Sequence, residues 1–325
     1  MNGTELSPQT SHNTAPASFI QSSVVKGPFV QGPLIQGLAA VVLFSLTVPM
    51  TQLALADFSA EFITATRGLL AGVLAWLVIL KQGWKWPTNN ALPWLLVAGA
   101  GVVLGFPYLL SLSLTQVAAA DMGVVLAGLP LTTSLLAAWI HHERHSAPFW
   151  LLAATGFLLL ALYVVLGLGE LPSFSAQDSW LLLATLLMGG IGYSAGAKAT
   201  KLINQPDAGW QTICWTLVLY LPLSALLWGM SWGEQAQQLT RPVALPSLLA
   251  LVYLALISQL WGFKFWYQAL ASSSVAKVSQ LQLLQPFFTL FFIALLLPQD
   301  ISGLQLVFCC LVVLNVYASI KVARR

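Results

Sequence analysis

Two glutamines just ahead of a proline are the first residues whose types and spacing point to chemistry. Gln282 and Gln285 lie three positions apart, so a helix would place both amides on one face, directly before Pro286. Proline has no N–H group, so it leaves the carbonyl of residue 282 without its helical donor. Two amides beside a freed carbonyl predict a binding site for a zwitterionic or neutral polar molecule. The alternative is a packing kink whose amides bond a neighbouring helix.

A single arginine lies inside an otherwise apolar run. Arg67 follows the start of that run by about seven residues, which is roughly 10 Å along a helix axis. If the run crosses a membrane, an arginine at this depth is costly unless it faces other helices or a water-filled cavity. One hypothesis is that Arg67 attracts an anionic group or pairs at a gate with an acid such as Asp121. The other is that it extends to the nearby interface, with Glu61 or Asp121 as its partner. Lys264 is a separate candidate for an inner gate.

The chain holds one cluster that resembles a metal site, formed by His141, Glu143 and His145. The order His142-Glu143-Arg144-His145 differs from the His-Glu-x-x-His pattern of zinc hydrolases. Polar residues at this position are also what ends an apolar helix at a membrane surface. The sequence therefore predicts no metal ion, no cofactor and no catalytic residue.

The elements that carry these residues are long and apolar. Of the 325 residues, 58% are hydrophobic and 7% are charged, whereas an ordinary soluble domain has roughly a quarter charged residues. So little charge cannot cover a water-facing surface, which predicts an all-α integral membrane protein. Runs of about 20 apolar residues, each long enough to span a bilayer as a helix, occur ten times. They cover residues 34–54, 60–80, 91–112, 117–141, 147–167, 180–202, 208–230, 246–268, 275–298 and 303–321.

Three segments are predicted to lie outside the helices. Residues 1–33 are rich in small polar residues and proline, which predicts a disordered N-terminal tail without the pattern of a signal peptide. Residues 168–179 form an expected outer linker, and residues 322–325 form a basic C-terminal end. No loop is long enough to form a soluble domain.

The lysines and arginines are distributed unevenly between the two sides of the predicted helices. With the N-terminus in the cytoplasm, eleven of the thirteen lie on the inner side, one lies on the outer side, and Arg67 lies within a helix. Basic residues favour the cytoplasmic side, so this excess predicts a multi-pass protein with both termini in the cytoplasm. Two termini on one side require an even number of spans, which agrees with ten.

The two halves of the sequence repeat. A shift of 156 residues places Pro130 on Pro286 and aligns residues 117–146 with 273–302 without a gap. Each half, 34–167 and 180–321, has five predicted helices, and an odd number places the halves in opposite orientations. Inverted repeats of this kind are typical of secondary transporters.

Such carriers bind their substrates between the halves, near the middle of the membrane. The predicted substrate site therefore combines Gln282, Gln285 and Pro286 with Pro130, the repeat partner of Pro286. Tyr193 and Trp266 are aromatic candidates for its lining. Beside Tyr193, Gly192 and Gly196 form a Gly-x-x-x-Gly pair, which predicts close packing of that helix against its neighbours.

Four segments carry motifs that, with the ten runs and the repeat, point to one family. They are Phe62-Ile-Thr-Ala-Thr-Arg67-Gly68, Leu129-Pro130-Leu-Thr-Thr-Ser-Leu-Leu-Ala-Ala-Trp139 running into His142-Glu143-Arg144, Trp266-Tyr267-Gln268-Ala269-Leu270, and residues 278–286. Over about residues 34–321 the chain resembles the drug/metabolite transporter superfamily, specifically bacterial exporters of the EamA type. The resemblance implies export of amino acids, metabolites, amines or drugs across the cell inner membrane, and it does not identify the substrate.

The chain departs from this family pattern at two places. The family usually has a glycine and a glutamate where this chain has Pro298-Gln299-Asp300, so a role tied to that glutamate does not carry over. The tryptophan that the family often places in its first helix is replaced here by Phe44.

Transport is the function that these patterns favour over two others. A membrane-embedded enzyme would need converging nucleophilic, basic or metal-binding residues, and a non-transporting membrane partner or sensor would be expected to carry a soluble domain. The sequence has no P-loop, so ATP is not the direct energy source and a secondary transporter is expected. The expected partners are a small-molecule substrate and the lipid bilayer, with a homodimer left open and no nucleic acid.

Overall fold

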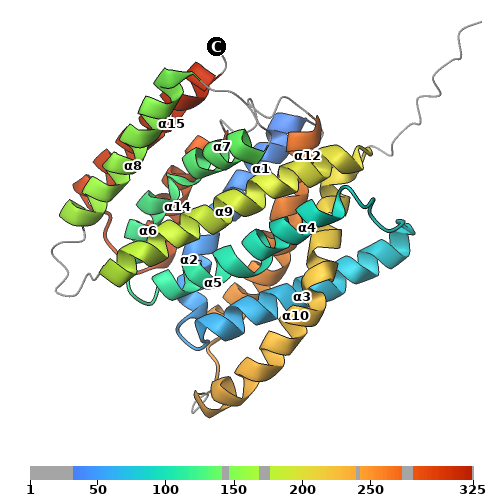
Figure 1. The fold of residues 1–325 in the computed structure, drawn as a ribbon. Helices are drawn as coiled ribbons and strands as arrows, with labels where there is room; N and C mark the ends of the chain where they lie inside the picture. The colour runs from blue at the N-terminus through green and yellow to red at the C-terminus, as the bar shows by residue number, and fades with distance from the viewer. Residues whose placement is uncertain (1–31, 141–145, 168–175, 239–241, 273–280, 324–325) are drawn as a thin grey trace, which may run out of the picture. The chain divides into compact units, whose positions relative to one another are not determined.

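The computed structural model of the chain describes residues 32–140, 146–167, 176–238, 242–272 and 281–323. Residues 1–31, which make up most of the expected tail, lie outside the described residues. The expected linker is described only from residue 176, where it already belongs to a helix, and the basic end is described only to residue 323. Within the described ranges every regular element is a helix (Figure 1).

The helices of the first half come before residue 168 and those of the second half after residue 175. The first half contains α1 Pro33–Ser45, α2 Thr47–Ala54, α3 Ala60–Gln82, α4 Leu92–Gly99, η1 Ala100–Gly105, α5 Phe106–Ser113, α6 Ala119–Leu126, α7 Leu129–Ile140 and α8 Ala147–Gly167. The second half contains α9 Ala176–Ile203, α10 Ala208–Gln238, α11 Leu245–Val252, η2 Tyr253–Gly262, α12 Phe263–Ser272, η3 Gln282–Leu284, α14 Gln285–Leu296 and α15 Gly303–Ala323.

Joined end to end, these helices form stretches of membrane-spanning length. Seven of them are long and apolar enough to cross a membrane, and three further apolar helices are shorter within the described residues. Each of the ten predicted runs overlaps one of these stretches, so the protein is a multi-pass helical membrane protein. The seven are Leu34–Ala54, Ala60–Gln82, Leu92–Ser113, Ala119–Ile140, Trp180–Ile203, Ala208–Gln238 and Leu245–Leu270, and the shorter three are Ala147–Tyr163, Gln282–Leu296 and Gly303–Ser319.

Several of these stretches change helix type near their middle. A turn at Leu46 separates α1 from α2, and another break separates α6 from α7. The elements η1 and η2 are π-helices, in which a wider turn changes the hydrogen-bond partners of the backbone. Pro107, Pro130 and Pro286 each lie at the second position of the helix that follows a break, where a missing N–H group costs little.

The element bounds recur at one spacing in the two halves. The first residues of α7 and α14, Leu129 and Gln285, lie 156 positions apart, and so do the first residues of α8 and α15, Ala147 and Gly303. Shifted by the same number, η1 falls inside η2. The repeat seen in the sequence is therefore a repeat of helices.

Helices that are equivalent in this repeat pack against each other. Helix α3 lies along α10, and α8 lies along α15 (Figure 1). Gly68 of α3 and Ser224 of α10 are equivalent positions, and a methyl group added to Gly68 would lie 2.5 Å from the Ser224 hydroxyl oxygen. Equivalent residues of the two halves are thus in direct contact.

Acidic residues gather at one end of the helices, called here the acidic end. Asp57 and Glu61 lie around the start of α3, and Glu234 lies near the end of α10. The start of α3 is fixed by Ser59, whose hydroxyl accepts a hydrogen bond from Phe62 N at 3.2 Å. From there α3 runs to the opposite end.

Lysines contact tryptophan rings at that opposite end, called here the basic end. Lys264 Nζ lies 4.3 Å from the ring centroid of Trp261 and 4.7 Å from that of Trp210. Lys198 Nζ lies 3.8 Å from the ring centroid of Trp94. An aromatic face attracts a cation without a counter-ion. Lys264 therefore has aromatic partners in this conformation, and its role at a gate stays a prediction.

Candidate functional site

Arg67 lies in the interior of the helix packing. It sits in the third turn of α3, and its residue is only 2% exposed. Its Nη2 donates a hydrogen bond to Gln259 Oε1 at 2.8 Å, and Gln259 Nε2 donates to the main-chain oxygen of Val102 at 2.9 Å. This chain of hydrogen bonds joins α3 and η1 of the first half to η2 of the second half.

A break in backbone hydrogen bonding explains why Val102 accepts this bond. In a π-helix a carbonyl accepts from the residue five positions later, which for Val102 is Pro107, a residue without an N–H group. The neighbouring N–H of Phe106 bonds to Gly101 O instead. The side chain of Gln259 supplies the missing donor. Sequence reasoning overlooked Gln259, although a single amide within the apolar run 254–262 was a visible signal.

An aromatic cluster, formed by Phe44, Tyr193, Phe263 and Trp266, adjoins this arginine. The ring centroids of Phe44 and Phe263 are 4.9 Å apart, and those of Tyr193 and Trp266 are 6.1 Å apart. All four residues are buried, and Gly192, which precedes Tyr193, packs against Val102 at the end of the Arg67–Gln259–Val102 hydrogen bonds. Trp266 Nε1 is buried without a hydrogen-bond partner. The structure thus brings Tyr193 and Trp266 together, and it adds Phe44, which occupies the position noted for the family tryptophan.

The two glutamines of the predicted site are also buried. Gln282 is 2% exposed and Gln285 is 8% exposed. Among the described residues, Gln282 Nε2 and Gln285 Oε1 have no hydrogen-bond partner. The hydroxyl oxygen of Ser45 lies 3.2 Å from the main-chain oxygen of Gln285, and Ser45 follows Phe44 of the aromatic cluster. The backbone at Gln285 therefore contacts the same part of α1 that supplies the aromatic cluster.

Pro130 and Pro286 occupy matching places in the two halves. Each is buried, and each lies at the second position of its helix, α7 or α14. The polar amides stand only beside Pro286, because Leu129 is the neighbour of Pro130 at the position equivalent to Gln285. The side-chain amides therefore come from the second half, whereas the first half supplies the hydroxyls of Thr132, Thr133 and Ser134, which donate to main-chain oxygens.

The expected charge pair of Arg67 with Asp121 is not formed. Asp121 Oδ1 accepts hydrogen bonds from Tyr163 at 2.5 Å and from Gln305 at 2.8 Å. The alternative, in which Arg67 extends to the interface beside Glu61, is not observed either, because Arg67 is buried and Gln259 holds its Nη2. Arg67 is thus paired with neither Asp121 nor Glu61 in this structure.

The histidine cluster at residues 141–145 lies outside the described residues. Among the described residues, no group of three or more His, Cys, Asp or Glu side chains is arranged to hold a metal ion.

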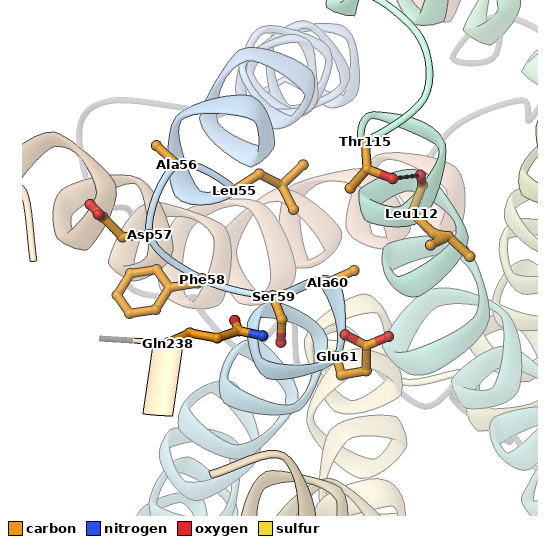
Figure 2. A pocket seen from close by; sticks show the side chains of 10 residues that line it. All are labelled: Leu55, Ala56, Asp57, Phe58, Ser59, Ala60, Glu61, Leu112, Thr115 and Gln238. Carbon is orange, nitrogen blue, oxygen red and sulfur yellow. Dashed lines mark hydrogen bonds between the residues drawn. The ribbon is translucent and has the colours of Figure 1, made fainter. Parts of the chain in front are cut away.

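Two hollows open at the acidic end. The first, of about 420 Å³, is shown in Figure 2 between the α2–α3 corner and the end of α5. The second, of about 440 Å³, lies between α3, α5 and α10. Glu61 lines both hollows and precedes Arg67 by six residues, roughly 9 Å along the helix axis. Arg67 itself lines neither hollow.

The family of the chain follows from its match to known sequences. The profile of the EamA-like transporter family matches residues 32–167 and 178–320. The chain belongs to the EamA-like transporter family. The two matched segments are the same two halves whose helices recur at a spacing of 156 residues.

Curated relatives of this EamA-like protein are named as transporters. The uncharacterized transporter YdeK of Bacillus subtilis (strain 168) is 38% identical over 271 residues, covering 82% of this chain and 89% of YdeK. A probable terminal-alkyne amino-acid exporter of Streptantibioticus cattleyicolor is 25% identical over 241 residues, covering 73% of this chain and 75% of the relative. A solved structure with 20% identity matches with a TM-score of 0.57 over 90% of this chain and 98% of its own, which shows a shared fold.

In this EamA-like protein the buried polar groups differ in charge and in the hydrogen bonds that they can form. The guanidinium of Arg67 offers positive charge and N–H donors, whereas the amides of Gln282 and Gln285 offer both donors and acceptors without charge. The aromatic cluster adds apolar ring faces, and its Phe44 is adjacent in sequence to Ser45, which contacts the main chain of Gln285. Such a set suits binding of a small organic molecule, and it contains no nucleophile–base pair.

Proposed function

We propose that this EamA-like protein is a secondary exporter of small metabolites, amino acids or drugs. In this proposal the two halves are inverted five-helix repeats in the bacterial inner membrane, and they alternate between an inward-open and an outward-open arrangement. The substrate binds between them, at the level of Arg67, the aromatic cluster and Gln282 with Gln285.

The observation that carries the proposal is the packing of equivalent helices on each other. The α3–α10 and α8–α15 contacts, together with the meeting of Gly68 and Ser224, are what a two-fold relation between the halves produces. Two related halves have two related ways of packing, which gives a carrier two states of similar free energy. The breaks at Leu46 and in η1 and η2 support a site at the same level, since irregular backbone at membrane depth is tolerated where it lines a cavity or is buried in protein.

The name of one relative supports amino acids as substrates. The relative from Streptantibioticus cattleyicolor is named for export of a terminal-alkyne amino acid. An amino acid is a zwitterion, and the buried set here combines a cation with neutral amides. We therefore place amino acids and related small polar molecules first among the candidate substrates.

A flux measurement tests the proposed function. Everted membrane vesicles with and without the protein are incubated with labelled amino acids, amines and dyes. We expect at least one solute to enter vesicles that contain the protein several-fold faster than control vesicles, because an exporter moves solute into an everted vesicle. Equal entry of every solute into both kinds of vesicle would contradict the proposal.

The proposed orientation places both termini in the cytoplasm. The basic end then faces inward, in keeping with the preference of lysine and arginine for that side. A reporter that is active only outside the cytoplasm, fused after Arg325, is expected to give background signal, whereas the same reporter inserted after Gln238 at the end of α10 is expected to be active. A strong signal from the Arg325 fusion would overturn the orientation.

A further inference from the structure

The guanidinium of Arg67 keeps unused hydrogen-bond donors although it is buried. Its Nε and Nη1 have no acceptor in the part of the chain that the structure describes, and its Nη2 uses one hydrogen for Gln259 Oε1. A guanidinium has two edges with paired N–H groups, formed by Nη2 with Nη1 and by Nη2 with Nε. Since Gln259 takes only one of the two Nη2 hydrogens, one complete edge is left free whichever hydrogen it takes.

No carboxylate of the described residues neutralises this charge. Arg67 makes no ion pair there, and its one bonded acceptor is the neutral amide oxygen of Gln259. The described acids that carry hydrogen bonds do so elsewhere: Asp57 accepts from Ala244 N, Glu61 from Tyr108, Asp121 from Tyr163 and Gln305, and Asp207 from Gln211. Buried charges are paired in proteins, because an isolated ion in a low-dielectric interior costs several kcal/mol.

We propose that the free edge of Arg67 binds the carboxylate group of the transported molecule. A carboxylate presents two oxygens at the spacing of two parallel N–H groups, so it fits one guanidinium edge as a bidentate partner. The proposal rests on the proposed transport function, and it narrows the substrates to small molecules that carry a carboxylate.

The surroundings of Arg67 define the rest of such a molecule. Tyr193 belongs to the aromatic cluster and follows Gly192, which packs against Val102 at the end of the hydrogen bonds from Arg67, so an apolar portion attached to the carboxylate meets rings from α1, α9 and α12. Trp266 Nε1 is a further free donor in that cluster. A short apolar carboxylic acid or amino acid satisfies both requirements, whereas a simple amine leaves the guanidinium without a counter-ion.

Access to Arg67 requires movement of the two halves. The residue is 2% exposed in this conformation, so the bound carboxylate enters from a state in which the helices around Arg67 are apart. The Arg67–Gln259–Val102 hydrogen bonds cross from the first half to the second and back. An anion that binds at Arg67 therefore acts on a contact between the halves.

Matched probes test the carboxylate requirement directly. Purified full-length protein in lipid nanodiscs is heated with norvaline, leucine, phenylalanine or pentanoate, and with norvalinamide, leucinamide, phenylalaninamide or pentanamide, at equal ionic strength. We expect at least one carboxylate to raise the unfolding temperature by about 2–4 °C at roughly ten times its dissociation constant, and its amide to leave it unchanged. No response to any carboxylate, or equal responses to acid and amide, would overturn the proposal.

Three variants connect the response to Arg67. Arg67→Gln removes the charge and is expected to weaken binding of the responding carboxylate by about 100-fold. Arg67→Lys keeps the charge but loses the planar edge, so about a tenfold loss is expected. Gln259→Glu supplies a carboxylate from within the protein and loses the Nε2–Val102 hydrogen bond. Its ion pair with Arg67 is expected to offset that loss and to abolish the response, and the unfolding temperature of the variant without ligand shows whether it folds. An unchanged response in Arg67→Gln or in Gln259→Glu contradicts the assignment, and the second variant decides if the first does not fold.

Flux of the same probes separates this proposal from the broader one. Uptake of each acid and amide is measured in proteoliposomes that contain the protein. Transport of the amides without the acids would leave a transporter and refute the carboxylate site. Binding of an acid that depends on Arg67, without flux of any probe or of the solutes in the everted-vesicle screen, would retain the site and refute transport.

Discussion

Replacement of Gly101 by alanine is expected to lower the unfolding temperature of the protein by roughly 10 °C. A methyl group at Gly101 would lie 2.6 Å from both Cα and N of Gly192 and 2.7 Å from the main-chain oxygen of Met188. All three are backbone atoms of α9, so no side chain can turn aside to make room. Overpacking of this kind costs about 3 kcal/mol or more, and each kcal/mol lowers the unfolding temperature by roughly 2–4 °C.

Gly192, which faces Gly101 across this contact, explains why the expected drop in unfolding temperature is large. A methyl group at Gly192 would lie 2.4 Å from Val102 Cγ1 and 2.9 Å from Val102 N. The two glycines therefore allow η1 of the first half and α9 of the second half to touch along their backbones. Small residues serve this purpose in membrane proteins, where close van der Waals packing holds helices together.

Gly229 provides the matched control for this substitution. It lies in α10, is exposed, and a methyl group added there would meet no atom within 4 Å. Gly229→Ala is expected to leave the unfolding temperature unchanged or to raise it slightly, because alanine is a better helix former than glycine by about 1 kcal/mol. Tryptophan fluorescence during heating measures both variants. Similar unfolding temperatures for the two would show that η1 and α9 are not in close contact.

Much of the architecture was predictable because the membrane imposes it. Apolar runs of about 20 residues have to be helices in hydrocarbon, and all ten runs overlap helical stretches of the structure. The spacing of Gly192 and Gly196 predicted close packing, which the contacts of Gly192 with η1 and of Gly196 with Tyr267 confirm. The 156-residue shift found at Pro130 and Pro286 reappears in the bounds of the helices.

The partners of buried polar groups were not predictable in the same way. Arg67 and Gln259 are 192 positions apart, and Asp121 and Gln305 are 184 apart. Such contacts depend on how helices are rotated and packed, which the composition of each run does not specify. The charge of Arg67 suggested an acid such as Asp121 as its partner, yet the packing brings it an amide and gives Asp121 a tyrosine and an amide instead.

The changes of helix type within the spans could be predicted only in part from the sequence. Prolines mark the starts of α5, α7 and α14, as their chemistry requires. The π-helices have no comparable residue signature, because a wider turn is selected by packing as well as by the local sequence. Val102 illustrates how local sequence and packing act together. Pro107 removes the backbone donor of its carbonyl, which the sequence shows, but only the fold brings Gln259 to replace that donor.

Substitution of both Gln282 and Gln285 by leucine is expected to abolish transport while the protein remains folded in the membrane. Leucine inserts into a bilayer more readily than glutamine, so insertion is not impaired. Gln282 Nε2 and Gln285 Oε1 are buried without partners, so their replacement removes few contacts within the protein. For a bound substrate, each lost hydrogen bond to a buried polar group is worth about 1–3 kcal/mol, and two losses together weaken binding by at least roughly 30-fold.

The matched control for the double variant is Gln237→Leu. Gln237 is exposed near the end of α10, so its replacement makes the same chemical change at a site remote from η3 and α14. Membrane content is measured by immunoblot and flux by the everted-vesicle assay, with the substrate found there. Normal flux in Gln237→Leu and none in the double variant, at equal membrane content, is the expected pair of results. If the double variant transports with unchanged kinetics, the amides only pack the kink before Pro286, and the substrate binds elsewhere between the halves.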